Sequence, residues 1–280
     1  MLGKLLKHEW KSIWKIPVLL IGILMITAVI AGLTFALPIW ESDWIGLPLS
    51  GLMLLLLFYF AMIAASVGIT VYMAVRCYKS MFTDEGYLTH TLPVSSRQIL
   101  NCKVITMSVW TLITEIAIII SLVVFGGVTF LALSTKSSRF AMDVMEVLWE
   151  IRNIWESPMM KGFGACCVSL VCLTLVSSAS SALILIGAIT LGQKVRGHRI
   201  LGAVGAYFGI TTIVQIIAIV LSIPLMVKMV MDSAYLSIFE TSPFSFYTSI
   251  YWIMTAVYLV VGVGLYFMSD YMLRRQLELE

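Results

Sequence analysis

The chain has 280 residues, of which 60% are hydrophobic and only 12% are charged. A soluble protein carries roughly twice that charged fraction, so the composition excludes an ordinary soluble globular protein. The net charge of +3 comes with no basic patch interleaved with aromatic residues, and nucleic-acid binding therefore has no support.

Six long apolar runs divide the chain. A helix that crosses a bilayer needs about 20 predominantly apolar residues, and each run leaves room for such a helix. The runs predict six membrane spans, within residues 15–41, 43–76, 104–135, 161–194, 199–228 and 240–270. We therefore expect an all-α integral membrane protein with six transmembrane helices.

Basic residues are unevenly distributed between the segments that connect these spans. Only five of the 18 lysines and arginines fall in one alternating set of segments, namely Lys136, Arg139, Arg152, Lys161 and Lys228. The others lie in the terminal segments and in the loops at 76–103 and 194–199. Because the basic-rich side of a membrane protein faces the cytoplasm, both termini and these two loops are predicted to be cytoplasmic.

Residues 1–16 form the first predicted element, an amphipathic helix that lies in the plane of the membrane surface. Apolar side chains recur there at helical spacing, at Leu2, Leu5, Leu6, Trp10, Ile13 and Trp14. Lysines occupy much of the other face, where their charges meet anionic lipid. The residues expected at the interface are Lys4, Lys7, Trp10, Lys11 and Trp14. A simple anchor for the first span and a mechanical role both remain open.

The cytoplasmic segment 76–103, between the second and third spans, is longer than a turn between two helices requires. Thr83 is a suitable N-cap for a short helix, and Pro93 ends that helix because the residue before a proline avoids helical geometry. Ser95 followed by Gln98 is a capping box, which predicts a second helix that continues into the third span. A structured loop of this size indicates a docking surface for another protein.

The loop also carries a recognisable stretch, Met81-Phe-Thr-Asp-Glu-Gly-Tyr-Leu-Thr-His-Thr-Leu-Pro-Val-Ser95, followed by Leu100 and Lys103. This stretch resembles the same loop in permease subunits of bacterial ATP-binding-cassette transporters of the type-2 exporter class. In that class the segment is the coupling helix, which docks on the ATPase subunit. The resemblance implies that the ATPase interface contains Asp84, Glu85, Gly86, Tyr87, Leu88 and His90.

The same resemblance implies a function and a location. The chain as a whole, residues 1–280, is expected to be a single transmembrane permease domain of an exporter in the bacterial cell membrane. It is expected to move a hydrophobic or amphipathic substrate, either a peptide or a lipid-like compound. ATP and Mg²⁺ are expected on the separate ATPase subunit, and a second permease subunit, identical or related, is expected to complete the pathway.

The segment 136–161 is predicted to lie on the opposite, extracytoplasmic side. It contains an amphipathic helical pattern made by Phe140, Val144, Val147, Leu148, Ile151, Ile154 and Trp155. Acidic residues lie elsewhere on the helix, and Trp149 and Trp155 are expected near the membrane interface. A structural cap or lid and a binding site for peptide or lipid are both compatible with this pattern. The resembling family more often places its larger outer segment between the fifth and sixth spans.

Two strongly polar residues fall inside predicted spans, Glu115 in the third and Gln215 in the fifth. An acid near the bilayer centre costs at least ~2.5 kcal/mol, so Glu115 is expected to be protonated or hydrogen-bonded. A hydrogen bond between helices and a role along the substrate path both remain open for these residues. Glycines in the last three spans are expected to allow close helix contacts, among them Gly187, Gly192 and Gly262. The Gly205-x-x-x-Gly209 spacing is compatible with packing within the subunit or between subunits.

Motifs for catalysis are missing from the sequence. It contains no Gly-x-x-x-x-Gly-Lys-Ser/Thr loop, so this chain is not itself expected to be the ATPase. It contains no His-Glu-x-x-His motif, and we expect no bound metal and no cofactor. The chain is therefore not expected to be an enzyme by itself. The alternative to a permease is a non-transporting membrane scaffold or sensor whose cytoplasmic loop binds a partner.

Overall fold

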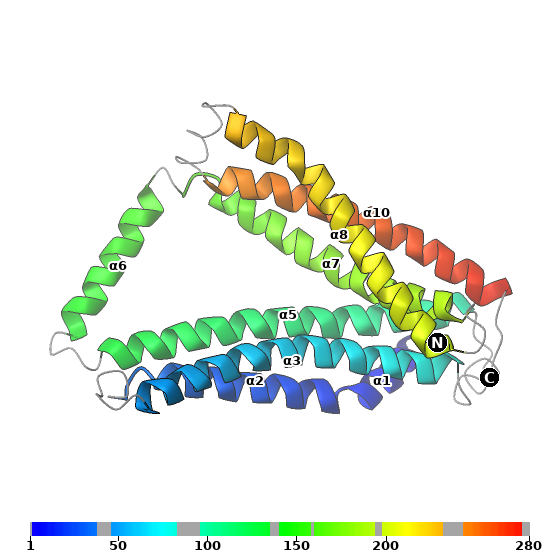
Figure 1. The fold of residues 1–280 in the computed structure, drawn as a ribbon, viewed down its shortest axis with the longest axis horizontal. Helices are drawn as coiled ribbons and strands as arrows, with labels where there is room; N and C mark the ends of the chain where they lie inside the picture. The colour runs from blue at the N-terminus through cyan, green and yellow to red at the C-terminus, as the bar shows by residue number, and fades with distance from the viewer. Residues whose placement is uncertain are drawn as a thin grey trace. The chain divides into compact units, whose positions relative to one another are not determined.

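The computed structural model describes residues 2–37, 46–82, 96–134, 140–157, 160–193, 198–231 and 243–275. No strand occurs in these ranges, and α-helices account for most of them. The helices are α1 (Leu2–Ile13), α2 (Lys15–Leu33), α3 (Gly46–Phe82), α5 (Ser96–Ser134), α6 (Phe140–Glu156), α7 (Phe163–Gly192), α8 (Arg199–Met231) and α10 (Pro243–Arg275) (Figure 1).

Six of these helices are long and apolar enough to cross a membrane, which confirms the predicted number of spans and the all-α class. The candidate spans are Lys15–Leu33, Gly46–Met81, Arg97–Leu133, Phe163–Gly192, Arg199–Lys228 and Pro243–Met272. The second and third are 36 and 37 residues long, longer than the apolar runs suggested. Lysine and arginine are good helix formers, so these helices continue where the apolar run stops.

The chain divides into two compact units. Unit 1 contains Met1–Glu9, Met73–Leu112 and Ile154–Glu280, and unit 2 contains Trp10–Tyr72 and Ile113–Asn153. Four helices, α1, α3, α5 and α6, are each divided between the two units.

Unit 2 is built on contacts between α2, the first part of α3 and the last part of α5. Its buried core residues are Leu24, Ala28, Ala31, Phe58 and Ala65. Phe125 of α5 stacks on Phe58 of α3, with ring centroids 5.2 Å apart. A Cβ atom at Gly32 would lie 2.8 Å from the Cβ of Val128, so only glycine permits this approach of α2 to α5.

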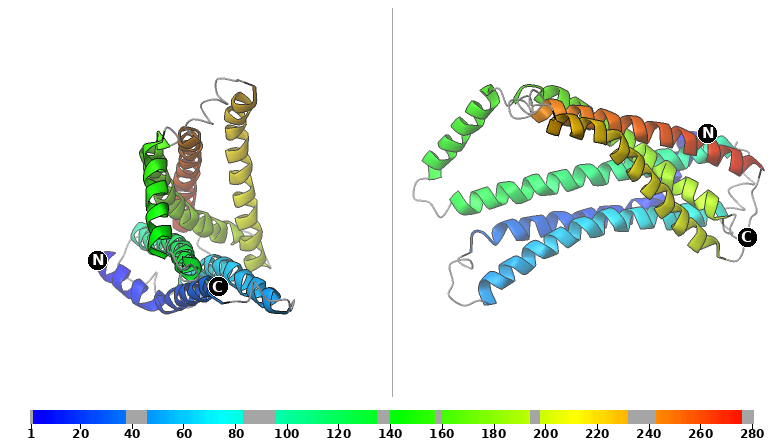
Figure 2. Two further views of the ribbon diagram at one scale, coloured as in Figure 1. Left: turned by 90° about the vertical axis from the view of Figure 1, so that its left-hand side faces the viewer. Right: turned by 45° about the horizontal axis from the view of Figure 1, so that its top comes forward.

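Unit 1 has α7, α8 and α10 as its main packing elements. α7 and α10 lie side by side and α8 crosses them (Figure 1 and Figure 2). Ser180 Oγ donates a hydrogen bond of 2.7 Å to the Tyr258 carbonyl, and Gly187 lies against Leu265. Because both residue numbers increase together along this contact, α7 and α10 run parallel.

The glycines of unit 1 differ in whether another helix packs closely against them. A Cβ at Gly192 would lie 2.4 Å from the Ala203 backbone nitrogen, and one at Gly262 would lie 2.7 Å from the Ser180 hydroxyl, so these positions allow close helix contacts as predicted. Gly205 and Gly209 on α8 have no other atom of the described chain within 4 Å of the Cβ position. They therefore make no close helix contact among the residues that the structure describes.

Candidate functional site

The predicted docking loop is framed by two helix ends in unit 1. α3 ends at Phe82 and α5 begins at Ser96, as the predicted helix restart requires. The loop residues between them, 83–95, lie outside the described residues, and so do all six predicted ATPase-interface residues from Asp84 to His90. The described part of the site consists of the two helices that flank the loop and the residues in contact with them.

The first turns of α5 are attached to α10 by two side-chain contacts. Arg97 Nε donates to both carboxylate oxygens of Asp270, at 3.3 and 3.2 Å. The Tyr266 hydroxyl donates to Asn101 Oδ1 at 2.9 Å. Arg97 and Asn101 are four residues apart, as are Tyr266 and Asp270, so each pair lies on one face of its helix. The two contacts together join one face of α5 to one face of α10.

The Arg97–Asp270 ion pair is asymmetric in its exposure to solvent. The side chain of Asp270 is only 10% exposed, whereas that of Arg97 is 57% exposed. The carboxylate is thus largely withdrawn from water and depends on protein hydrogen bonds, while the guanidinium keeps most of its hydration. Charge-assisted hydrogen bonds of this kind are shorter and stronger than neutral ones.

A second ion pair attaches α5 to α1. Lys103 Nζ donates to Glu9 Oε1, and the two side chains are only 6% and 19% exposed. Glu9 lies on the less exposed face of α1, together with Leu5 and Leu6, whereas the lysines of α1 are exposed. Lys103 and Asn101 are two residues apart, so they point to different sides of α5. The start of α5 is therefore held by α10 on one side and by α1 on another.

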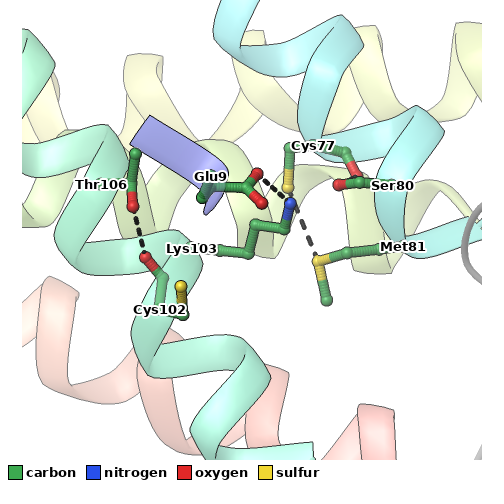
Figure 3. A network of polar contacts seen from close by, with 7 residues as sticks. All are labelled: Glu9, Cys77, Ser80, Met81, Cys102, Lys103 and Thr106. Atoms are coloured by element: carbon green, nitrogen blue, oxygen red, sulfur yellow. Dashed lines mark hydrogen bonds and ion pairs between the residues drawn. The ribbon is translucent and has the colours of Figure 1, made fainter. Parts of the chain in front are cut away.

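The Lys103–Glu9 pair lies among buried sulfur-containing and small side chains of α3 and α5 (Figure 3). Cys77 Sγ donates to Met81 Sδ at 3.6 Å. The hydroxyls nearby are satisfied within their own helices, since Ser80 donates to the Cys77 carbonyl and Thr106 donates to the Cys102 carbonyl. In such a dry setting each charge of the pair depends on the other, and removal of one partner leaves an uncompensated buried charge.

The two intramembrane polar residues belong to different units. Glu115 on α5 is in unit 2, and its Oε2 atom is buried and has no hydrogen-bond partner among the described residues. Gln215 on α8 is in unit 1 and is exposed, next to the buried Val214. The roles proposed for these residues, in a helix contact or along a substrate path, stay predictions.

The residues predicted at the membrane interface are exposed. Lys4, Lys7, Trp10 and Lys11 lie on α1, and Trp14 lies between α1 and α2. The formation of a helix over Leu2–Ile13 agrees with the prediction for this segment. Its position at the membrane surface stays a prediction.

Sequence reasoning missed four members of this site: Glu9, Asn101, Tyr266 and Asp270. Glu9 had a detectable signal, because it is an acid within the apolar stripe of an otherwise basic amphipathic helix. Asp270 was interpreted only as the boundary of the last span. Within the described ranges, no group of three or more His, Cys, Asp and Glu side chains is arranged to hold a metal ion.

Comparison with protein-family models, with curated proteins and with solved structures found no significant match to this chain.

Proposed function

We propose that this chain is the membrane-spanning permease subunit of an ATP-binding-cassette exporter. It would move a hydrophobic or amphipathic substrate, a peptide or a lipid-like compound, with energy from ATP that a separate subunit hydrolyses. ATP and Mg²⁺ would bind to that ATPase subunit. A second permease subunit, identical or related, would complete the pathway in the bacterial cell membrane.

The attachment of α5 to both terminal helices is the observation that carries this proposal. The loop 83–95 leads directly into α5, an unbroken helix of 39 residues. Its first turns are joined to α10 through Arg97 and Asn101 and to α1 through Lys103. A force on the loop would therefore reach α5, α1 and α10 together. A scaffold or sensor only has to bind its partner and does not require such a connection. The attachment of α5 to α1 and α10 therefore favours the transporter.

The same contacts support an orientation for the chain. The Glu9–Lys103 and Arg97–Asp270 pairs place α1, the start of α5 and the C-terminal part of α10 at one end of unit 1. The basic residues Lys4, Lys7, Arg97 and Lys103 belong to this end. We assign it to the cytoplasm, where an ATPase subunit is accessible to the loop.

The proposal is tested by co-purification with a candidate ATPase encoded next to this chain. Tyr87→Ala and Leu88→Ala remove the apolar side chains that the loop is expected to insert into the partner. Truncation of a central apolar or aromatic anchor commonly weakens an interface by ~2 kcal/mol or more, so the double variant should lose most of the bound ATPase and of the transport.

Trp149→Ala serves as the matched control, because Trp149 is an exposed aromatic residue on α6, away from the loop in sequence. This variant should retain the ATPase. Equal retention by the double variant and by the parent would contradict the assignment of the loop as the coupling element. A loop partner without a nucleotide-binding site would favour the scaffold or sensor instead.

A further inference from the structure

Helix α6 has an apolar face that is exposed at the positions the structure describes. Leu148 and Trp155 lie on that face, seven residues and about two turns apart, and both are largely exposed. Glu146 and Glu150 are also exposed and lie on the other side of the helix. Residues 148 and 150 point in nearly opposite directions, because two steps of an α-helix turn the side chain by about 200°. α6 is thus amphipathic in the structure, and its apolar side is exposed at Leu148.

The C-terminal turn of α6 is fixed against the starts of two membrane spans. The Trp155 ring packs edge-on against Phe163, the first residue of α7, with centroids 5.5 Å apart. Phe163 in turn packs edge-on against Phe244 at the start of α10, with centroids 5.2 Å apart. All three residues belong to unit 1. This aromatic contact places Trp155 at the level where α7 and α10 begin.

The connection from α6 to α7 is short, and the structure describes both of its ends. The Met160 amide donates to the Ser157 carbonyl at 3.1 Å. Gly162 has a left-handed backbone with φ of 85°, which favours glycine over residues with a side chain, and its carbonyl accepts from the Cys166 amide at 2.9 Å at the start of α7. These contacts link the end of α6 to the start of α7.

The other end of α6 is also tied to a membrane span. Only residues 135–139 separate α5 from α6, which limits their separation to roughly 20 Å. α6 has 17 residues and is about 25 Å long. α5 ends and α7 begins on the same side of the membrane, because they are consecutive spans. A helix attached at both ends to that surface, with Leu148 and Trp155 on an exposed apolar face, is suited to lie in the interface.

We propose that α6 lies in the headgroup layer of the membrane surface where α5 ends and α7 begins, with Leu148 and Trp155 facing lipid and Glu146 and Glu150 in water. The charges agree with this orientation. Arg139 precedes the helix and Lys161 follows it, so a cation stands near the phosphates at each end. The acidic face points away from anionic headgroups. The occupant of the apolar face is therefore lipid, and the inference does not depend on the proposed transport function.

Site-directed spin labelling tests this directly in full-length protein. A nitroxide is attached at position 148 or, as the matched control, at position 150, after replacement of the five native cysteines. The protein is reconstituted in vesicles of phosphatidylethanolamine and phosphatidylglycerol. Collisions with oxygen, which concentrates in hydrocarbon, are compared with collisions with a nickel chelate, which stays in water. We expect oxygen to dominate at position 148 and nickel to dominate at position 150.

Two other outcomes would overturn the inference. Dominant nickel collisions at both positions would mean that α6 stands in water away from the membrane. Low collision rates with both reagents at position 148 would mean that protein, such as a second copy of the chain, covers the apolar face. If the cysteine-free protein does not fold, a genetically encoded fluorescent amino acid at the same positions replaces the nitroxide, with brominated lipid and aqueous iodide as quenchers.

Discussion

The Lys103–Glu9 ion pair is expected to hold α1 against α5, and Lys103→Met tests this. Methionine keeps most of the length of the side chain but removes the ammonium, so the Glu9 carboxylate is left in a largely dry pocket. Loss of one partner of a buried pair costs about 3–5 kcal/mol. Because the Glu9 side chain is 19% exposed, water still reaches it and the lower end of that range applies.

The cost of Lys103→Met should appear as local opening of α1, because that helix can relieve the unpaired charge by moving into water. A loss of about 3 kcal/mol corresponds to a roughly 100-fold increase in the population of the open form. Amide hydrogen exchange of Leu2–Ile13, measured in nanodiscs, should accelerate by about that factor.

Two further variants decide whether the pair itself is responsible. Glu9→Leu combined with Lys103→Met removes both charges. The free energy of opening of α1, obtained from its amide exchange, should then return to within about 1 kcal/mol of the parent value, since apolar replacement of a whole buried pair is often neutral. Lys7→Met removes an exposed cation from α1 and should change little. The reasoning is refuted if the double variant opens α1 as far as Lys103→Met alone.

The other predictions concern single positions. Arg97→Ala removes the guanidinium from the Asp270 carboxylate, which is only 10% exposed, and should lower stability by about 1–3 kcal/mol, measured by thermal unfolding. Gly192→Val should prevent folding, because its Cβ would lie 2.4 Å from a backbone atom. Gly205→Val meets open space and should be expressed and melt like the parent. Equal expression of the two variants would contradict the close contact at Gly192. Glu115→Gln should preserve expression and melting temperature, because the amide has nearly the same volume and can still hydrogen-bond. Unchanged transport by that variant would exclude a titrating role for Glu115.

The features that the sequence predicted correctly are those encoded locally. Each apolar run is long enough to specify a membrane-spanning helix by itself, and the helix beginning at Ser96 follows from a capping pattern within a few residues. Gly192 was also predictable, because a glycine within an apolar helix permits a close contact.

The side-chain pairs of the site could not be predicted in the same way. Glu9 and Lys103 are 94 positions apart, and Arg97 and Asp270 are 173 apart. Many acids and bases lie at comparable separations, and tertiary packing alone selects these partners. The same limit applies to Gly205, whose spacing predicted packing either within the subunit or between subunits; the described residues make no close contact there, and packing between subunits stays a prediction.

The central claim is that the loop 83–95 docks on an ATPase subunit, and photocrosslinking from inside that loop measures this most directly. A photoreactive amino acid at position 88, in the full-length chain expressed in its native host, is activated in intact cells, and mass spectrometry identifies the crosslinked protein. The account predicts an ATP-binding-cassette ATPase, with no such product when the photoreactive group is placed at position 149 on α6. A partner without a nucleotide-binding site, or the same ATPase captured equally from both positions, would contradict it.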